Sequence, residues 1–175
     1  MRKAVSLVVL LGLFPVLVMA QETPKAEVFG GYQFTHLSAG GDSENFNGWN
    51  ASVAGNVTKD FGVAGDFSGS YKTIGGVSAK IYTYTFGPVV NLNHQGTFNP
   101  FVHALFGGAH LSASVSGVGS GGANGFTMMM GGGADAKLGP RFAVRLFQAD
   151  WVYYHFQGVG ESKNVRISTG VVARF

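Results

Sequence analysis

The sequence has no cysteine, few charged residues and, after residue 20, no long apolar run. The absence of cysteine excludes disulfide frameworks and cysteine metal sites. Charged residues make up 12% of the chain, about half of the usual share in a soluble domain. The basic residues are single and scattered, which excludes a nucleic-acid-binding surface. No segment after residue 20 approaches the roughly 18 continuous apolar residues of a membrane helix, so a helical membrane protein is also excluded.

The first 20 residues have the pattern of a secretory signal peptide. Arg2 and Lys3 form a positive start, residues 4–18 are an apolar run, and small residues up to Ala20 suit a cleavage site. The run is too short for a membrane-spanning helix. We therefore expect residues 1–20 to be a signal peptide and residues 21–175 to form one domain. Without Arg2 and Lys3, the 12 basic residues become ten, against nine acidic ones, so the domain is nearly neutral.

The rest of the chain alternates between apolar and polar residues with a period of two. Around residues 49–58, Trp49, Val53 and Val57 share one face, whereas Asn50 and Asn56 share the other. Successive side chains of a strand point to opposite faces, so this pattern predicts a strand with one apolar and one polar side.

Eight such strands can be counted along the chain. They are expected at 28–37, 48–58, 61–71, 80–92, 98–111, 125–138, 142–155 and 164–175. Long loops rich in Gly, Ser, Asn and Asp are expected at 38–47, 72–79, 112–124 and 156–163. The connections between them, at 59–60, 93–97 and 139–141, are short turns. An even number of strands of about ten residues, with alternating long and short connections, is typical of an outer-membrane barrel.

The apolar face carries the bulky residues, and this decides between two kinds of barrel. An eight-stranded barrel leaves an interior only wide enough for side chains or one small ligand. Bulky rings such as Trp49, Phe67 and Phe86 therefore point to lipid, and small polar groups such as Asn50 and Ser68 point inside. A soluble barrel would have the reverse pattern. The sequence predicts an all-β fold: an eight-stranded antiparallel up-and-down transmembrane β-barrel.

The last strand ends on Phe175, and the apolar residues Ala173 and Val171 precede it on the same face. This end resembles the C-terminal signal that the barrel-assembly machinery of outer membranes reads. With the signal peptide and the eight strands, residues 21–175 resemble the small OmpA/OmpX-type outer-membrane β-barrel family. The resemblance implies location in the outer membrane of a Gram-negative-type bacterium, in contact with lipid and lipopolysaccharide. The periplasmic peptidoglycan-binding domain of larger OmpA-type proteins is not expected here.

Two His-Leu-Ser-Ala tetrads begin at His36 and at His110. A His-x-Ser pair on an outer-leaflet strand resembles lipid A deacylases of this architecture, in which the serine attacks an ester and the histidine is the base. That chemistry needs a carboxylate that orients the histidine. Asp42 and Glu44 lie near the first tetrad, and no acid lies near the second. We therefore expect both histidines to be polar residues at headgroup height, with lipid A modification as the alternative.

Several charged residues fall on the inward face of the predicted strands. On strict alternation they are Asp66, Asp135, Lys137, Arg145, Arg166 and Arg174. Asp150 joins them if a bulge shifts the register after Leu146. A charge in a narrow interior needs a partner, so these residues predict a network that plugs the barrel rather than a catalytic site.

The predicted turn at 139–141 allows one pair of these charges to be assigned. Counting outward from Pro140 places Asp135 opposite Arg145 on adjacent strands. Asp66 lies at a similar distance from its own turn, so Arg145 is expected between the two carboxylates. Its planar guanidinium can serve both acceptors. Loss of Arg145 is then expected to destabilise the barrel more at neutral than at acidic pH.

These patterns predict a non-enzymatic, monomeric outer-membrane protein with a structural or adhesive role through four extracellular loops. A lipid A-modifying enzyme and a narrow pore for small solutes are the alternatives. No cofactor or metal site is expected, and no nucleic acid partner. The expected partners are outer-membrane lipid, lipopolysaccharide, the barrel-assembly machinery and an extracellular ligand of the loops.

Overall fold

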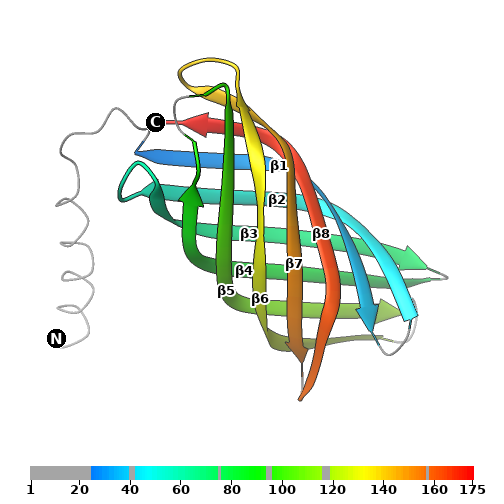
Figure 1. The fold of residues 1–175 in the computed structure, drawn as a ribbon. Helices are drawn as coiled ribbons and strands as arrows, with labels where there is room; N and C mark the ends of the chain where they lie inside the picture. The colour runs from blue at the N-terminus through cyan, green and yellow to red at the C-terminus, as the bar shows by residue number, and fades with distance from the viewer. Residues whose placement is uncertain (1–24, 40–41, 75, 94–95, 116–118, 157) are drawn as a thin grey trace, which may run out of the picture.

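A computed structural model describes residues 25–39, 42–74, 76–93, 96–115, 119–156 and 158–175. The predicted signal peptide lies outside these residues. The chain forms eight strands: β1 (Ala26–Ala39), β2 (Asp42–Asn56), β3 (Phe61–Ile74), β4 (Val77–Asn91), β5 (Phe98–Val115), β6 (Gly119–Lys137), β7 (Phe142–Phe156) and β8 (Val159–Arg174). Each strand pairs antiparallel with the next, and β8 pairs with β1 to close the barrel (Figure 1). The predicted fold is confirmed.

The alternation along the strands has the predicted orientation. Phe86 is 68% exposed on the outer wall, whereas Asn50 is 1% exposed inside the barrel. Trp49 and Tyr84 are also exposed, and Ser68 is buried. Large rings on the outside and small polar groups on the inside match a barrel whose solvent is lipid.

The prediction of four long loops was wrong. Residues 112–115 continue β5, residues 119–124 begin β6, and the other three segments also belong mostly to strands. β5 and β6 stay paired as far as Val115 and Gly119. Glycine and serine have little strand preference of their own, but the neighbouring strand satisfies their backbone N–H and C=O groups. We call this end of the barrel, where the β1–β2, β3–β4, β5–β6 and β7–β8 connections lie, the hairpin end, and the opposite end the turn end.

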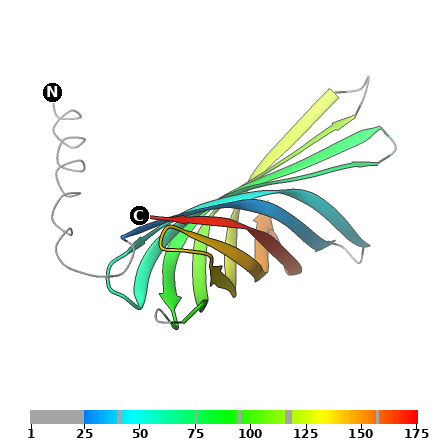
Figure 2. The same ribbon diagram turned by 90° about the horizontal axis from the view of Figure 1, so that it is seen from above.

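The wall divides near the hairpin end. Among the described residues, backbone pairing extends no further than Asn47–Tyr71 between β2 and β3, and Gly125–Phe156 between β6 and β7. Strands β3 to β6 remain paired with one another beyond these points. Figure 2 shows the β3–β4 and β5–β6 hairpins running on together, apart from the β1–β2 hairpin. We call this extension, residues 72–74, 76–80, 110–115 and 119–124, the projecting sheet.

A bulge in β7 changes which residues face the interior. The pairing of β7 with β6 shifts between Arg145 and Phe147, and its pairing with β8 shifts between Arg145 and Gln148. Leu146 and Phe147 are consecutive, and both are exposed on the outer wall. An extra residue in one strand produces this arrangement, because it restarts the alternation one step later. Asp150 therefore points inward. The sequence analysis expected this position only if a bulge shifted the register.

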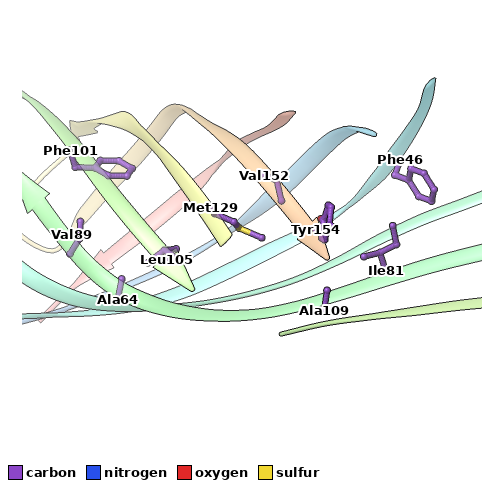
Figure 3. Packing of buried hydrophobic residues seen from close by; sticks show 10 residues of the cluster. All are labelled: Phe46, Ala64, Ile81, Val89, Phe101, Leu105, Ala109, Met129, Val152 and Tyr154. Carbon is purple, nitrogen blue, oxygen red and sulfur yellow. The ribbon is translucent and has the colours of Figure 1, made fainter. Parts of the chain in front are cut away.

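The interior also holds a cluster of apolar side chains that the alternation did not predict. Phe101, Leu105, Met129 and Val152 are buried within it. Figure 3 shows that Phe101 lies toward one end of this cluster, whereas Phe46 lies at the other. The space inside eight strands is filled by side chains of any polarity that fit, so apolar groups occupy the levels that the charged residues leave.

Candidate functional site

Arg166 on β8 links opposite sides of the barrel interior. Its Nη1 donates to Asp66 Oδ1 on β3 at 2.8 Å, and its Nε donates to Asp150 Oδ2 on β7 at 2.8 Å. The Arg166 side chain is only 1% exposed. A buried guanidinium must be paired to avoid a large desolvation cost, and here two carboxylates compensate it.

Three neutral or weakly basic side chains form further hydrogen bonds with these acids. Asp66 accepts a hydrogen bond from Asn50 Nδ2 at 2.9 Å. Asp150 Oδ1 lies 2.8 Å from His103 Nε2, and Asp150 Oδ2 accepts from Gln148 Nε2 at 2.8 Å. The sequence alone did not place His103 or Gln148 in this network. The inward position of His103, midway between buried Phe101 and Leu105, is the signal that could have found it.

A second ion pair lies nearer the turn end. Arg145 Nε donates to Asp135 Oδ1 at 2.8 Å, and the two residues are cross-strand partners on β7 and β6. The rings of Phe29 on β1 and Phe101 on β5 are centred 4.4 and 4.3 Å from the Arg145 guanidinium carbon. Both distances are in the range of cation–π attraction. Arg145 is thus held by one carboxylate and two aromatic rings.

Hydrogen bonds join the two ion pairs into one network. Arg145 Nη1 donates to Gln148 Oε1 at 2.7 Å, and Gln148 in turn bonds Asp150. At the turn end, Arg174 Nη2 lies 3.6 Å from Asp135 Oδ2, and Arg174 Nε lies 3.1 Å from Glu27 Oε1. Charged and polar side chains therefore run from Glu27 up to Asp66 without a break. We call this set the interior network.

One expectation about these charges needs correction. Asp66 is not a partner of Arg145, because Arg166 binds Asp66 instead. The strands of a barrel are tilted, so an equal count from two different turns does not place residues of distant strands at one level. Lys137, the last residue of β6, is half-buried at the turn end, and its part in the network stays a prediction.

The two His-Leu-Ser-Ala tetrads occupy equivalent places on the β1–β2 and β5–β6 hairpins. His36 Nδ1 lies 2.7 Å from Asn45 Oδ1, and His110 Nδ1 lies 2.7 Å from Asn124 Oδ1. In both cases the partner is a cross-strand neighbour, on β2 or β6. An amide, rather than a carboxylate, thus holds each imidazole. Ser38 Oγ is 2.9 Å from Ser43 Oγ, so the serine of the first tetrad is also engaged with β2.

The C-terminal residue lies at the seam that closes the barrel. Phe175 N donates to Ala26 O at 2.9 Å, and Lys25 N donates to Phe175 O at 2.7 Å. The Phe175 ring is exposed, as is the side chain of Val171 on the same outer face of β8. Ala173, between them on that face, is half-buried.

The profile of a family described as "Outer membrane protein beta-barrel domain" matches residues 6–175. The chain belongs to this family. Its members span the outer membrane of bacteria, so the polar interior and the aromatic outer wall belong to a membrane-embedded barrel. The described residues include no helix long and apolar enough to cross a membrane.

Solved structures of outer-membrane barrels share the fold. Ail, the attachment invasion locus protein of Yersinia pestis, superposes with a TM-score of 0.65 at 22% identity, covering 87% of this chain and 99% of its own. Neisserial surface protein A has a TM-score of 0.72 at 14% identity, covering 89% and 100%. The N-terminal barrel of Pseudomonas aeruginosa OprF has a TM-score of 0.58 at 12% identity, covering 88% and 100%. At these identities the likeness concerns the fold. No curated protein sequence matches the chain.

Proposed function

We propose that this outer-membrane barrel has no enzymatic activity and serves as an adhesive surface protein, with its hairpin end outside the cell. The projecting sheet carries this proposal. Among the described residues, 119–124 of β6 pair only with β5, because β7 ends at Phe156, the partner of Gly125. An open strand edge presents a row of N–H and C=O groups that can bind a strand of another molecule.

The charges at the hairpin end favour a partner that is not a polyanion. Ail has been crystallised with the heparin analogue sucrose octasulfate. In this chain Lys72 forms an ion pair with Glu44. Lys80 on β4 and Lys163 on β8 are exposed but lie four strands apart. The described residues thus form no dense basic patch here, so backbone pairing is the stronger basis for adhesion.

The interior network argues against the pore alternative. Between its two ion pairs there is a cavity of about 30 Å³ that Asp66, His103 and Arg145 help to line. A volume of this size holds about two water molecules. A hydrated ion would have to break the Arg166 bridge across the lumen to pass.

Lipid A modification is the second candidate because of the geometry at His110. Its Nδ1 is bonded to an amide oxygen, which leaves Nε2 available as a base. Cysteine proteases use an asparagine in this orienting role. The same pair recurs at His36 and Asn45, and this repetition favours a structural cross-strand bond. Mass spectrometry of lipid A from cells with the wild-type protein or His110→Ala distinguishes the two: an altered acyl pattern that depends on His110 would favour the enzyme.

Adhesion can be tested with two matched glycine substitutions. Gly121 lies on the open edge of β6, and Gly139 lies at the turn end; a Cβ atom added at either position would meet no atom within 4 Å. A lysine blunts a strand edge. The protein is produced in a non-adherent bacterial host, and binding of the cells to an epithelial cell layer is counted. We expect binding with wild type and Gly139→Lys, and its loss with Gly121→Lys.

Both variants must first show normal membrane levels and heat-modifiable migration on a denaturing gel. Wild-type cells that bind no better than the empty host would contradict the adhesive role. Equal binding by the two lysine variants would show that the edge of β6 is not the contact.

A further inference from the structure

A pocket opens inside the barrel at the hairpin end, above the interior network. It has a volume of about 260 Å³, and we call it the mouth pocket. Its apolar lining comes from five strands: Leu37, Phe46, Ile81, Leu111, Tyr154 and Phe156. In Figure 3, Phe46, Ile81 and Tyr154 lie together at one end of the buried cluster. Each His-Leu-Ser-Ala tetrad contributes its leucine, so the repeated motif supplies two of the apolar wall residues.

Two polar residues that line the mouth pocket, Asn164 and Glu44, are already bonded to other residues. Asn164 Oδ1 accepts from Ser38 N at 2.9 Å, and Asn164 Nδ2 donates to Val152 O at 3.1 Å. Glu44 is bonded to Lys72. A polar ligand would therefore lose its hydration without gaining partners from these residues, which costs free energy. An apolar ligand incurs no such loss, and its burial is favourable in proportion to the area removed from water.

The size of the pocket limits the ligand further. A dry apolar cavity of about 150 Å³ holds one benzene molecule. A volume of about 260 Å³ thus suits roughly ten non-hydrogen atoms by proportion, just below the usual range for drug-sized ligands. Below the pocket the lumen is closed by Arg166 and its two carboxylates. The ligand therefore enters and leaves on the hairpin side.

One part of the pocket wall has no backbone pairing. Above Asn47 and Tyr71, β2 and β3 are no longer hydrogen-bonded strands. Phe46 and Lys72 follow directly, and the Lys72 ammonium lies 5.9 Å from the centre of the Phe46 ring. This part of the wall thus has side chains but no β2–β3 backbone pairing, and side chains rearrange far more readily than paired strands.

We propose that the mouth pocket binds a neutral alkyl chain of about ten carbon atoms, taken either from a free amphiphile or from a membrane lipid. Three features favour such a chain: the apolar lining from five strands, the bonded state of Asn164 and Glu44, and the Arg166 bridge that closes the lumen below the pocket. This site is separate from the open edge of β6, so its failure and the failure of the adhesive role are independent results.

The test is photolabelling of the full-length processed protein in lipid nanodiscs with a decan-1-ol that carries a diazirine. Mass spectrometry then locates the labelled residues. We expect labelling at Leu111, Ile81 or Tyr154 that saturates and that excess unlabelled decan-1-ol competes away. Leu111→Trp fills the pocket and should lower this labelling by about tenfold, equivalent to about 1.4 kcal/mol. Phe106→Trp, on the lipid-facing side of the same strand, is the matched control and should leave it unchanged.

Leu37→Trp, which fills the pocket from β1, is used as the pocket-filling variant if Leu111→Trp does not assemble. Nanodiscs made with a lipid that carries the diazirine on its acyl chain form the second arm. Pocket labelling by this lipid assigns the chain to the membrane, and labelling by decan-1-ol alone assigns it to a free amphiphile. Labelling confined to the lipid-facing wall, or labelling of the pocket that neither tryptophan variant reduces, would overturn the proposal.

Discussion

Replacing Arg166 with methionine tests whether the interior network holds the barrel together. The arginine is 1% exposed and compensates two carboxylates, Asp66 and Asp150. Methionine keeps most of the side-chain volume but removes the charge, so both acids would face each other across the lumen without a cation. Removal of one partner from a buried ion pair costs about 3–5 kcal/mol.

Hydrogen bonds that remain in the variant keep the loss within this range. Asp66 keeps the bond from Asn50, and Asp150 keeps those to His103 and Gln148. Each bond to a charged group contributes about 1.5–3 kcal/mol. The remaining hydrogen bonds therefore compensate part of the charge of the two acids. We expect Arg166→Met to lower the free energy of unfolding by about 4 kcal/mol at neutral pH.

The sign of the pH dependence follows from the charges. In the variant, protonation of either acid at low pH removes the uncompensated negative charge. In the wild type, protonation of the same acid breaks an ion pair. The difference in stability between the two proteins should therefore be greatest at neutral pH and should shrink as the pH falls.

The assay is urea unfolding in lipid vesicles, followed by tryptophan fluorescence and by migration on a denaturing gel without boiling. Arg141→Met, on the exposed β6–β7 turn, is the control and should stay within about 0.5 kcal/mol of wild type. Combining Arg166→Met with Asp66→Asn and Asp150→Asn should recover most of the loss, because neither acid is then left as a buried charge without Arg166. A loss below about 1 kcal/mol, or one that is equal at neutral and acidic pH, would contradict the stabilising role of Arg166.

Further predictions concern assembly, topology and conduction. Arg145→Ala should show a weaker pH dependence than Arg166→Met in the same unfolding assay, because its acid retains Arg174 at 3.6 Å; an equal dependence would contradict this. Deletion of Phe175 should lower outer-membrane levels in cell fractions while processed chains accumulate or are degraded, and normal levels would count against an assembly signal at this end. Single cysteines introduced at Gly121 and Gly139 should react differently with an impermeant maleimide on intact cells, the first strongly and the second not; the reverse would invert the topology. In planar bilayers the wild-type protein should give no steady conductance, and a stable open current would exclude the interior plug.

Local pattern alone was enough to predict the number of strands and the orientation of their faces. The side-chain period of a strand is two, so the positions of Trp49, Phe67 and Phe86 relative to Asn50 and Ser68 decide which face meets lipid. This information lies in consecutive residues and does not depend on which strands are neighbours. The closed barrel then follows, because no open sheet satisfies its backbone in lipid.

The ends of the strands and the pairing of the charges required the tertiary structure. Residues 112–115 and 119–124 have the composition of a loop, and they become strands because a neighbour accepts and donates their backbone hydrogen bonds. Arg166 and Asp66 are 100 residues apart in sequence. Their contact depends on the tilt of the strands and on the bulge after Arg145. The alternation of apolar and polar residues within a strand predicts neither feature. The mouth pocket has the same origin, since its wall is assembled from five strands whose relative heights only the closed barrel sets.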